Sequence, residues 1–143
     1  MAKIKGPTRY TCFKLNNVMR KIQRYYETAL ASYGLTAVQF YIFSILYQNN
    51  GIKFKDLAAK ANLDGSTVTG LLDRMEAAGF VVKKDDPADR RTLRIFLTEK
   101  SEEIAPEVMC KADELEEKLN KLIGEQDYLT FSNVLDLLFT EEV

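Results

Sequence analysis

The chain has 143 residues, of which 46% are apolar, and this size and composition predict one domain with a substantial core. It contains no histidine and only two cysteines, which excludes His-based catalytic triads, His-containing zinc sites and a disulfide framework. No apolar run approaches the roughly 20 residues that span a membrane, and the first residues lack a signal-peptide pattern, so we expect a cytoplasmic protein without a metal or other cofactor.

Charge is distributed unevenly along the chain. Residues 1–52 carry seven cations and one anion, residues 53–100 carry ten cations and eight anions, and residues 101–143 carry three cations and twelve anions. The net charge of −1 therefore does not argue against nucleic acid as a partner, because the local field depends on where the charges lie. The acidic C-terminal segment should point away from any polyanion.

Two helices are predicted before residue 51. Apolar residues recur every three or four positions from Thr8 to Tyr33, and Gly34 is a natural stop. Thr36 and Gln39 form a capping-box pattern that begins a second helix, which is apolar on most sides and therefore buried. Its aromatic residues either belong to the core or line a pocket for a small planar effector.

The next segment has the pattern of a helix-turn-helix. A short helix is predicted over residues 54–61, a polar turn over 62–65, and a second helix from Ser66 to about Ala78. The second helix places a polar face outward, which lets the backbone approach DNA closely and its hydroxyls bond to base edges or phosphates. Its N-terminus also favours a phosphate, although Ser and Thr begin many helices simply as caps. The candidate contacts on this face are Ser66, Thr67, Thr69, Gly70 and Arg74.

A hairpin, here called the wing, is predicted from Phe80 to Thr98. Its first strand ends at Lys84, a charged turn follows, and the second strand alternates apolar and other residues up to Leu97. Thr98 can cap the next helix. Three arginines near the tip favour contact with nucleic acid: Arg90, Arg91 and Arg94. The alternative is that they only pair with neighbouring aspartates on a solvated hairpin. Exposed ion pairs contribute about 0 to 1 kcal/mol of stability each, so stability alone explains little about so many charges at the tip.

Two helices are predicted at the C-terminal end. The first runs from Glu99 to about Ile123, and Pro106 should kink it or mark a late start. Gly124 separates it from a final helix. Both carry apolar stripes without an obvious partner in a small winged-helix body, which favours pairing with a second copy of the chain, although packing within one chain fits the same pattern.

The segment Leu63–Val81, followed by Asp-Pro-Ala-Asp-Arg-Arg at 86–91 and Leu-Thr at 97–98, resembles the MarR family of bacterial and archaeal transcription regulators. The resemblance covers essentially the whole chain. It implies a mainly α fold with a small β wing (α+β), in which residues 36–100 form a winged helix-turn-helix and residues 1–35 and 101–143 form a helical dimerisation region. It further implies a homodimer that binds a pseudo-palindromic operator with one recognition helix per half-site.

The same resemblance assigns roles within the wing. It implies that Arg91 enters the minor groove, held by an ion pair with Asp89 or Asp73, and that Arg90 contacts a neighbouring phosphate. Gly70 departs from the family pattern, because many members carry a larger polar or basic residue there. This departure puts one direct base contact in doubt.

Cys12 lies near the start of the first predicted helix, where it resembles the organic-hydroperoxide-sensing branch of the family. In that branch a cysteine is oxidised and tyrosines hold its thiolate, and Tyr26 falls where one such tyrosine is expected. Ala37 and Asn16 occupy the places of two other aromatic residues, so the resemblance is partial. The alternative is that Cys12 is a small buried apolar residue.

These observations predict a protein that is not an enzyme but a regulator that binds double-stranded DNA. We expect a homodimeric repressor that a small aromatic or lipophilic effector releases from its operator. Two alternatives remain: a thiol-based peroxide-sensing repressor that acts through Cys12, and a winged-helix module that binds protein instead of DNA.

Overall fold

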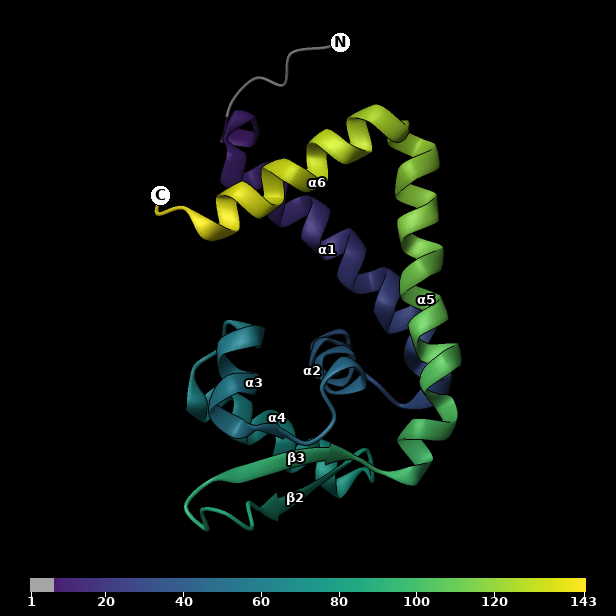
Figure 1. The fold of residues 1–143 in the computed structure, drawn as a ribbon. Helices are drawn as coiled ribbons and strands as arrows, with labels where there is room; N and C mark the ends of the chain where they lie inside the picture. Colours follow the sequence, from purple (N-terminus) through teal and green to yellow (C-terminus); the bar gives the residue numbers. More distant parts are fainter. Residues whose placement is uncertain (1–6) are drawn as a thin grey trace. The chain divides into compact units, whose positions relative to one another are not determined.

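The computed structural model describes residues 7–143, which are mainly helical with a small three-stranded sheet (Figure 1). This confirms the predicted fold class. The elements in chain order are η1 (Pro7–Arg9), α1 (Thr11–Leu30), η2 (Ala31–Tyr33), α2 (Ala37–Gln48), β1 (Ile52–Lys53), α3 (Phe54–Ala61), α4 (Gly65–Ala77), β2 (Val81–Asp85), β3 (Leu93–Leu97), α5 (Glu99–Ile123) and α6 (Glu125–Thr140).

The chain divides into two compact units, one that ends at Val108 and one that runs from Met109 to Val143. The first unit contains α1 together with the whole winged helix-turn-helix, and the second contains the rest of α5 and all of α6. The functional division into a DNA-binding domain and a dimerisation region remains a prediction.

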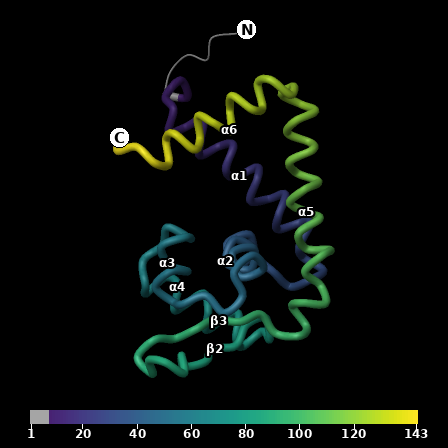
Figure 2. The backbone as a smooth tube through the Cα atoms, in the orientation of Figure 1, coloured from purple at the N-terminus to yellow at the C-terminus, as the bar shows by residue number. Residues whose placement is uncertain are grey.

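The sheet is antiparallel in the order β1-β3-β2. In the hairpin, Val81 pairs with Leu97 and Asp85 with Leu93, while Ile52 of β1 pairs with Ile95 of β3. Two residues are too few to show an alternating pattern, so β1 was not predicted. Figures 1 and 2 show α4 and α3 beside the β2–β3 hairpin, and both helices contact it.

Packing in the core of the first unit leaves the polar face of α4 exposed to solvent. Val68, Leu71, Leu72 and Met75 of α4 are all buried, as their spacing predicts. They belong to a core that also includes Phe43 of α2, Leu57 of α3, Phe80 and Ile95. Because one face of α4 is fixed against this core, the opposite face is exposed to solvent.

Local signals set most helix ends. The Thr36 hydroxyl accepts from the Gln39 amide N–H and the Gln39 side chain accepts from the Thr36 N–H, both at 3.2 Å, so the capping box is confirmed. The Thr98 hydroxyl accepts from the Ser101 N–H at 3.2 Å at the start of α5.

Two predicted helices differ from the structure in detail. The first is split into η1, α1 and η2. Tyr10, between η1 and α1, has an extended backbone, and at the other end the last turn tightens, with Gly34 at φ 76° and its N–H bonded to the Ala31 carbonyl. Pro106 does not delay α5, which begins at Glu99. Both Pro106 and Glu102 are exposed, so water can bond the Glu102 carbonyl that lacks its usual partner.

Within residues 7–143, no single helix is both long enough and apolar enough to cross a membrane.

Candidate nucleic-acid interface

The start of α4 is organised by Asp64, which the sequence interpretation missed. Its carboxylate accepts from the Ser66 hydroxyl at 2.7 Å, the Thr67 N–H at 2.8 Å and the Thr67 hydroxyl at 2.9 Å. These hydrogen bonds, led by the one from Ser66, lower the pKa of Asp64 to about 2. An Asp three residues before a Thr at a helix start is an N-cap signal, so the pattern was available in the sequence.

The predicted contact residues of α4 share one face. Ser66, Thr67 and Arg74 are exposed, and the Thr69 hydroxyl donates to the Gly65 carbonyl at 2.8 Å. At Gly70, an added Cβ would lie 3.7 Å from an Arg74 guanidinium nitrogen, an ordinary van der Waals distance. The Arg74 guanidinium therefore lies next to Gly70 and would still fit beside a small side chain there.

Asp73 does not hold Arg91, contrary to one of the predicted roles. Its carboxylate pairs with the Lys83 ammonium of β2, which also lies 3.7 Å from Glu76. The hydrogen bond with Asp73 is the main cause of the raised pKa of Lys83. Asp73 therefore has Lys83 of the adjacent strand as its partner, because α4 packs directly against β2.

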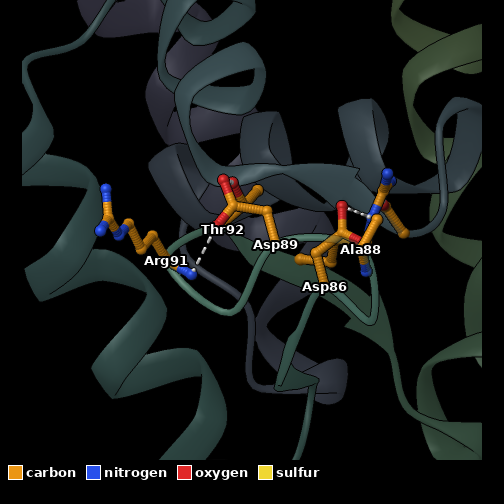
Figure 3. Close-up of polar contacts among 7 residues, drawn as sticks. Asp86, Ala88, Asp89, Arg91 and Thr92 are labelled. Carbon is orange, nitrogen blue, oxygen red and sulfur yellow. Dashed lines mark hydrogen bonds and ion pairs between the residues drawn. The ribbon is translucent and has the colours of Figure 1, made fainter.

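Asp89 shapes the turn of the wing through the backbone. Its carboxylate accepts from the Arg91 N–H at 3.0 Å and from the Thr92 hydroxyl at 3.3 Å, as Figure 3 shows for Arg91. The Arg91 side chain extends away from this carboxylate. Asp89 is therefore placed to position Arg91, but by fixing its main chain and not through the predicted ion pair.

Arg94 bonds groups of its own chain, including a neighbouring aspartate as the alternative for the wing predicts, and its role as a DNA contact stays a prediction. Its Nε donates to Asp86 at 2.9 Å and a terminal nitrogen donates to the Gly51 carbonyl at 2.8 Å. The Ala88 N–H also bonds Asp86, and these contacts lower the pKa of this buried carboxyl, the Ala88 bond most. Arg94 therefore joins the wing turn to the residue that precedes β1.

An open groove of about 460 Å³ brings the recognition helix and the wing together. Thr69 of α4 and Arg91 of the wing line it, together with Lys55 from the first turn of α3. Lys55 was not among the predicted contacts, and a lone lysine at a helix start gives little signal. Phe54, Thr92 and Leu93 complete the lining, and the two cations beside the Thr69 hydroxyl suit a phosphodiester backbone. Arg90 is exposed at the wing tip.

Cys12 and Tyr26 do not meet within one chain. Cys12 is exposed, so the prediction of a buried apolar residue is wrong for the single chain. Tyr26 is buried and stacks on Phe40 with ring centroids 4.6 Å apart. Both lie on α1, and the rise of about 1.5 Å per residue separates them by about 21 Å.

Comparisons with known proteins agree with this geometry. Residues 35–93 match the model of the MarR family. The chain is 33% identical over 124 residues to the HTH-type transcriptional regulator MgrA of Staphylococcus aureus, a match that covers 79% of this chain and 84% of MgrA.

Two solved structures are also similar. A MarR transcriptional regulator from Methanosarcina mazei Go1 has a TM-score of 0.78 and 27% identity over 88% of this chain and 91% of that chain. Reduced AbfR, solved bound to DNA, has a TM-score of 0.66 and 27% identity over 78% of this chain and 90% of that chain. Together with the winged helix-turn-helix fold, these matches establish that the chain belongs to the MarR family of transcription regulators.

Proposed function

We propose that this chain acts in the cytoplasm as a homodimeric repressor that binds a pseudo-palindromic duplex operator and leaves it when a small aromatic or lipophilic effector binds. The observation that carries the proposal is the groove that Lys55, Thr69 and Arg91 line. It joins a polar recognition helix to a cationic wing on one side of the same compact unit.

The two parts of the interface have different tasks in this proposal. The exposed face of α4 enters the major groove and contacts base edges. Arg91 enters the adjacent minor groove, where the concentrated negative potential favours a guanidinium, and Arg90 contacts a phosphate. Lys55, at the first turn of α3, adds a second cation for the backbone that crosses the groove.

Unpaired apolar surface supports the homodimer. No residue of α6 is buried, although the helix exposes Phe131, Leu135 and Phe139. In the first unit, α1 likewise exposes Phe13 and Leu15. Apolar patches of this kind in a folded chain mark protein–protein contacts, and a C2 dimer places one recognition helix on each half-site.

The effector part of the proposal starts from the aromatic cluster that joins α1 to α2. Tyr26 stacks on Phe40, and Tyr41 meets the ring of Tyr26 edge-on at 6.3 Å. Partial burial raises the pKa of the Tyr41 hydroxyl. An aromatic molecule that inserts beside these rings would change the packing of α1 on α2, which connects the terminal helix to the helix-turn-helix.

The test is selection of bound duplexes from a random pool by the full chain. The expected result is an enriched inverted repeat whose half-site centres lie about 10 base pairs apart. Adding salicylate-like phenols should then release the selected duplex, and peroxide should not. A pool without any enriched repeat would overturn the proposal and favour a module that binds protein. Release by peroxide that Cys12→Ser abolishes would replace the phenolic effector with thiol oxidation.

A further inference from the structure

The hydroxyl groups at the start of α4 already donate their protons to hydrogen bonds within the protein. A serine or threonine hydroxyl has one proton to donate and two lone pairs that accept. The Asp64 carboxylate is ionised at neutral pH, because its pKa lies at about 2, and an ionised carboxylate can only accept. Ser66 and Thr67 must therefore be the donors in their bonds to Asp64 at 2.7 and 2.9 Å.

The third hydroxyl of this surface is oriented in the same way. Thr69 bonds the Gly65 carbonyl at 2.8 Å, and a carbonyl is also only an acceptor, so the Thr69 proton points back at the helix. Ser66, Thr67 and Thr69 are all exposed. The first turns of the recognition helix thus present lone pairs to solvent, next to the negative charge of Asp64.

Such a surface is selective about what it can contact. Phosphate oxygens only accept, and the Asp64 carboxylate both repels them and occupies the Thr67 N–H that a phosphate would use. In the major groove, guanine N7 and O6 and thymine O4 are acceptors, whereas adenine N6 and cytosine N4 are donors. Among the polar groups of the major-groove base edges, only the amino groups of adenine and cytosine can donate to these hydroxyl lone pairs.

We propose that Ser66 and Thr67 determine operator specificity as hydrogen-bond acceptors, with Asp64 as the residue that positions their protons. The bases they contact carry an amino group on the major-groove edge, so adenine or cytosine stands at each contacted position and guanine or thymine is disfavoured there. Every base pair presents one amino group in the major groove, so the preference fixes which strand carries the adenine or cytosine. The inference rests on the proposed operator binding and adds a chemical rule for recognition.

The first experiment locates the contacted positions. Duplex selection is run with the wild type, Ser66→Ala, Thr67→Val and the control Ser32→Ala, which removes an exposed hydroxyl from η2. The two α4 variants should lose preference at one or two positions per half-site where the wild type selects adenine or cytosine, and the control should not. Selection of guanine or thymine at those positions, or variants with the wild-type profile, would overturn the inference.

The second experiment deletes the amino group itself. Purine in place of adenine, or 2-pyrimidinone in place of cytosine, at a located position should weaken wild-type binding about fivefold or more, as for loss of one specific contact. The same duplex should bind the matching hydroxyl-deleted variant no more weakly than the parent duplex does. Wild-type affinities within twofold of each other would contradict the inference.

The third experiment frees a hydroxyl proton of Ser66 or Thr67 from its hydrogen bond to Asp64. Asp64→Asn keeps an N-cap residue but introduces an amide that can donate to one hydroxyl, whose own proton then becomes free for DNA. This variant should accept guanine or thymine at a position where the wild type requires adenine or cytosine. An unchanged profile in this variant would overturn the positioning role of Asp64. A wild-type pool without any enriched site would instead remove the proposed operator binding on which the inference rests.

Discussion

The three arginines of the wing differ in what they contact. Arg94 is two-thirds buried and bonds Asp86 and Gly51, whereas Arg90 and Arg91 are exposed. Asp89 fixes the backbone at Arg91, and within residues 7–143 it forms no ion pair with the Arg91 guanidinium. The wing tip therefore presents two arginines to a ligand and uses the third to hold its own shape.

Residue patterns in the sequence predicted which side chains are exposed better than they predicted which side chains bond to other parts of the protein. Ser66 and Thr67 could be placed on the surface because the apolar positions of α4 define the opposite face, and Arg91 because it lies in a charged turn. The pairing of Arg94 with a neighbouring aspartate, Asp86, was the alternative predicted for the wing. The contacts of Arg94 with Gly51 and of Asp73 with Lys83 could not be predicted, because only folding brings these residues close.

Asp64 should make the stability of the protein sensitive to acid. Its folded-state pKa, about 2, lies below the ordinary 3.8, so it stabilises the fold above about pH 4 and this contribution is lost as the pH falls toward 2. Asp64→Asn keeps a cap but cannot titrate. We expect the melting temperature of the variant to fall by a few degrees less than that of the wild type between pH 5 and pH 2.5.

Thermal unfolding followed by circular dichroism at several pH values measures this difference. Asp136→Asn, on α6, is the control and should retain the wild-type slope. Asp86 also has a lowered pKa, so the slope of Asp64→Asn should be reduced but not abolished. Equal slopes for wild type and Asp64→Asn would show that the cap is not an ionised carboxylate.

The helices and the hairpin were predictable because their signals are local. α3 spans Phe54–Ala61 and α5 spans Glu99–Ile123, as the sequence patterns predicted, and the cap at Thr36 has the predicted bonds. β1 escaped prediction because its two residues form a strand only by pairing with β3. Elements defined by their own sequence were therefore predicted, and an element defined by its neighbour was missed.

Arg94 should position the wing for DNA. Arg94→Lys keeps the charge but cannot bond both Asp86 and Gly51 with a planar fork, and Arg94→Ala leaves the buried Asp86 carboxylate without its cation. We expect roughly tenfold weaker operator binding for Arg94→Ala and a smaller loss for Arg94→Lys. Melting temperature should fall further for the alanine variant.

Fluorescence anisotropy with a labelled duplex, together with thermal unfolding, separates binding from stability. The fall in melting temperature distinguishes a positioning role from a direct contact, because loss of a contact made only with DNA would not destabilise the free protein. Arg90→Lys, an exposed arginine on the same hairpin, is the matched control and should melt like the wild type. Wild-type operator affinity in folded Arg94→Ala would refute the positioning role.

The terminal helices carry apolar surface that neither compact unit buries on its own. The apolar stripes of the last two helices were visible in the sequence. Their partner was not, because an apolar stripe shows that a surface packs against something but does not identify the surface that covers it. In the structure Phe139 is 70% exposed and Leu135 is 41% exposed. In the proposed homodimer, a second copy of the chain covers this surface.

The dimer should depend on these side chains. Each buried Phe or Leu contributes about 1.5 to 3 kcal/mol, so Leu135→Glu with Phe139→Glu should raise the dimer dissociation constant by at least about a hundredfold. Analytical ultracentrifugation at micromolar concentrations measures this change. Asp136→Lys, on the same helix, is the control for altered charge. A monomeric wild type, or an undiminished dimer in the double variant, would contradict the proposed assembly.

The most direct test of the account is the salt dependence of operator binding by the wild type and by Arg91→Ala. Arg91 lines the groove and its backbone is fixed by Asp89, so its loss should weaken binding at least tenfold and reduce the slope of log K against log salt by roughly 1 per protomer. Lys121→Ala, which removes one cation from the acidic C-terminal segment, should retain the wild-type slope. Equal affinity and equal slope for Arg91→Ala and the wild type would contradict the claim that the wing binds DNA.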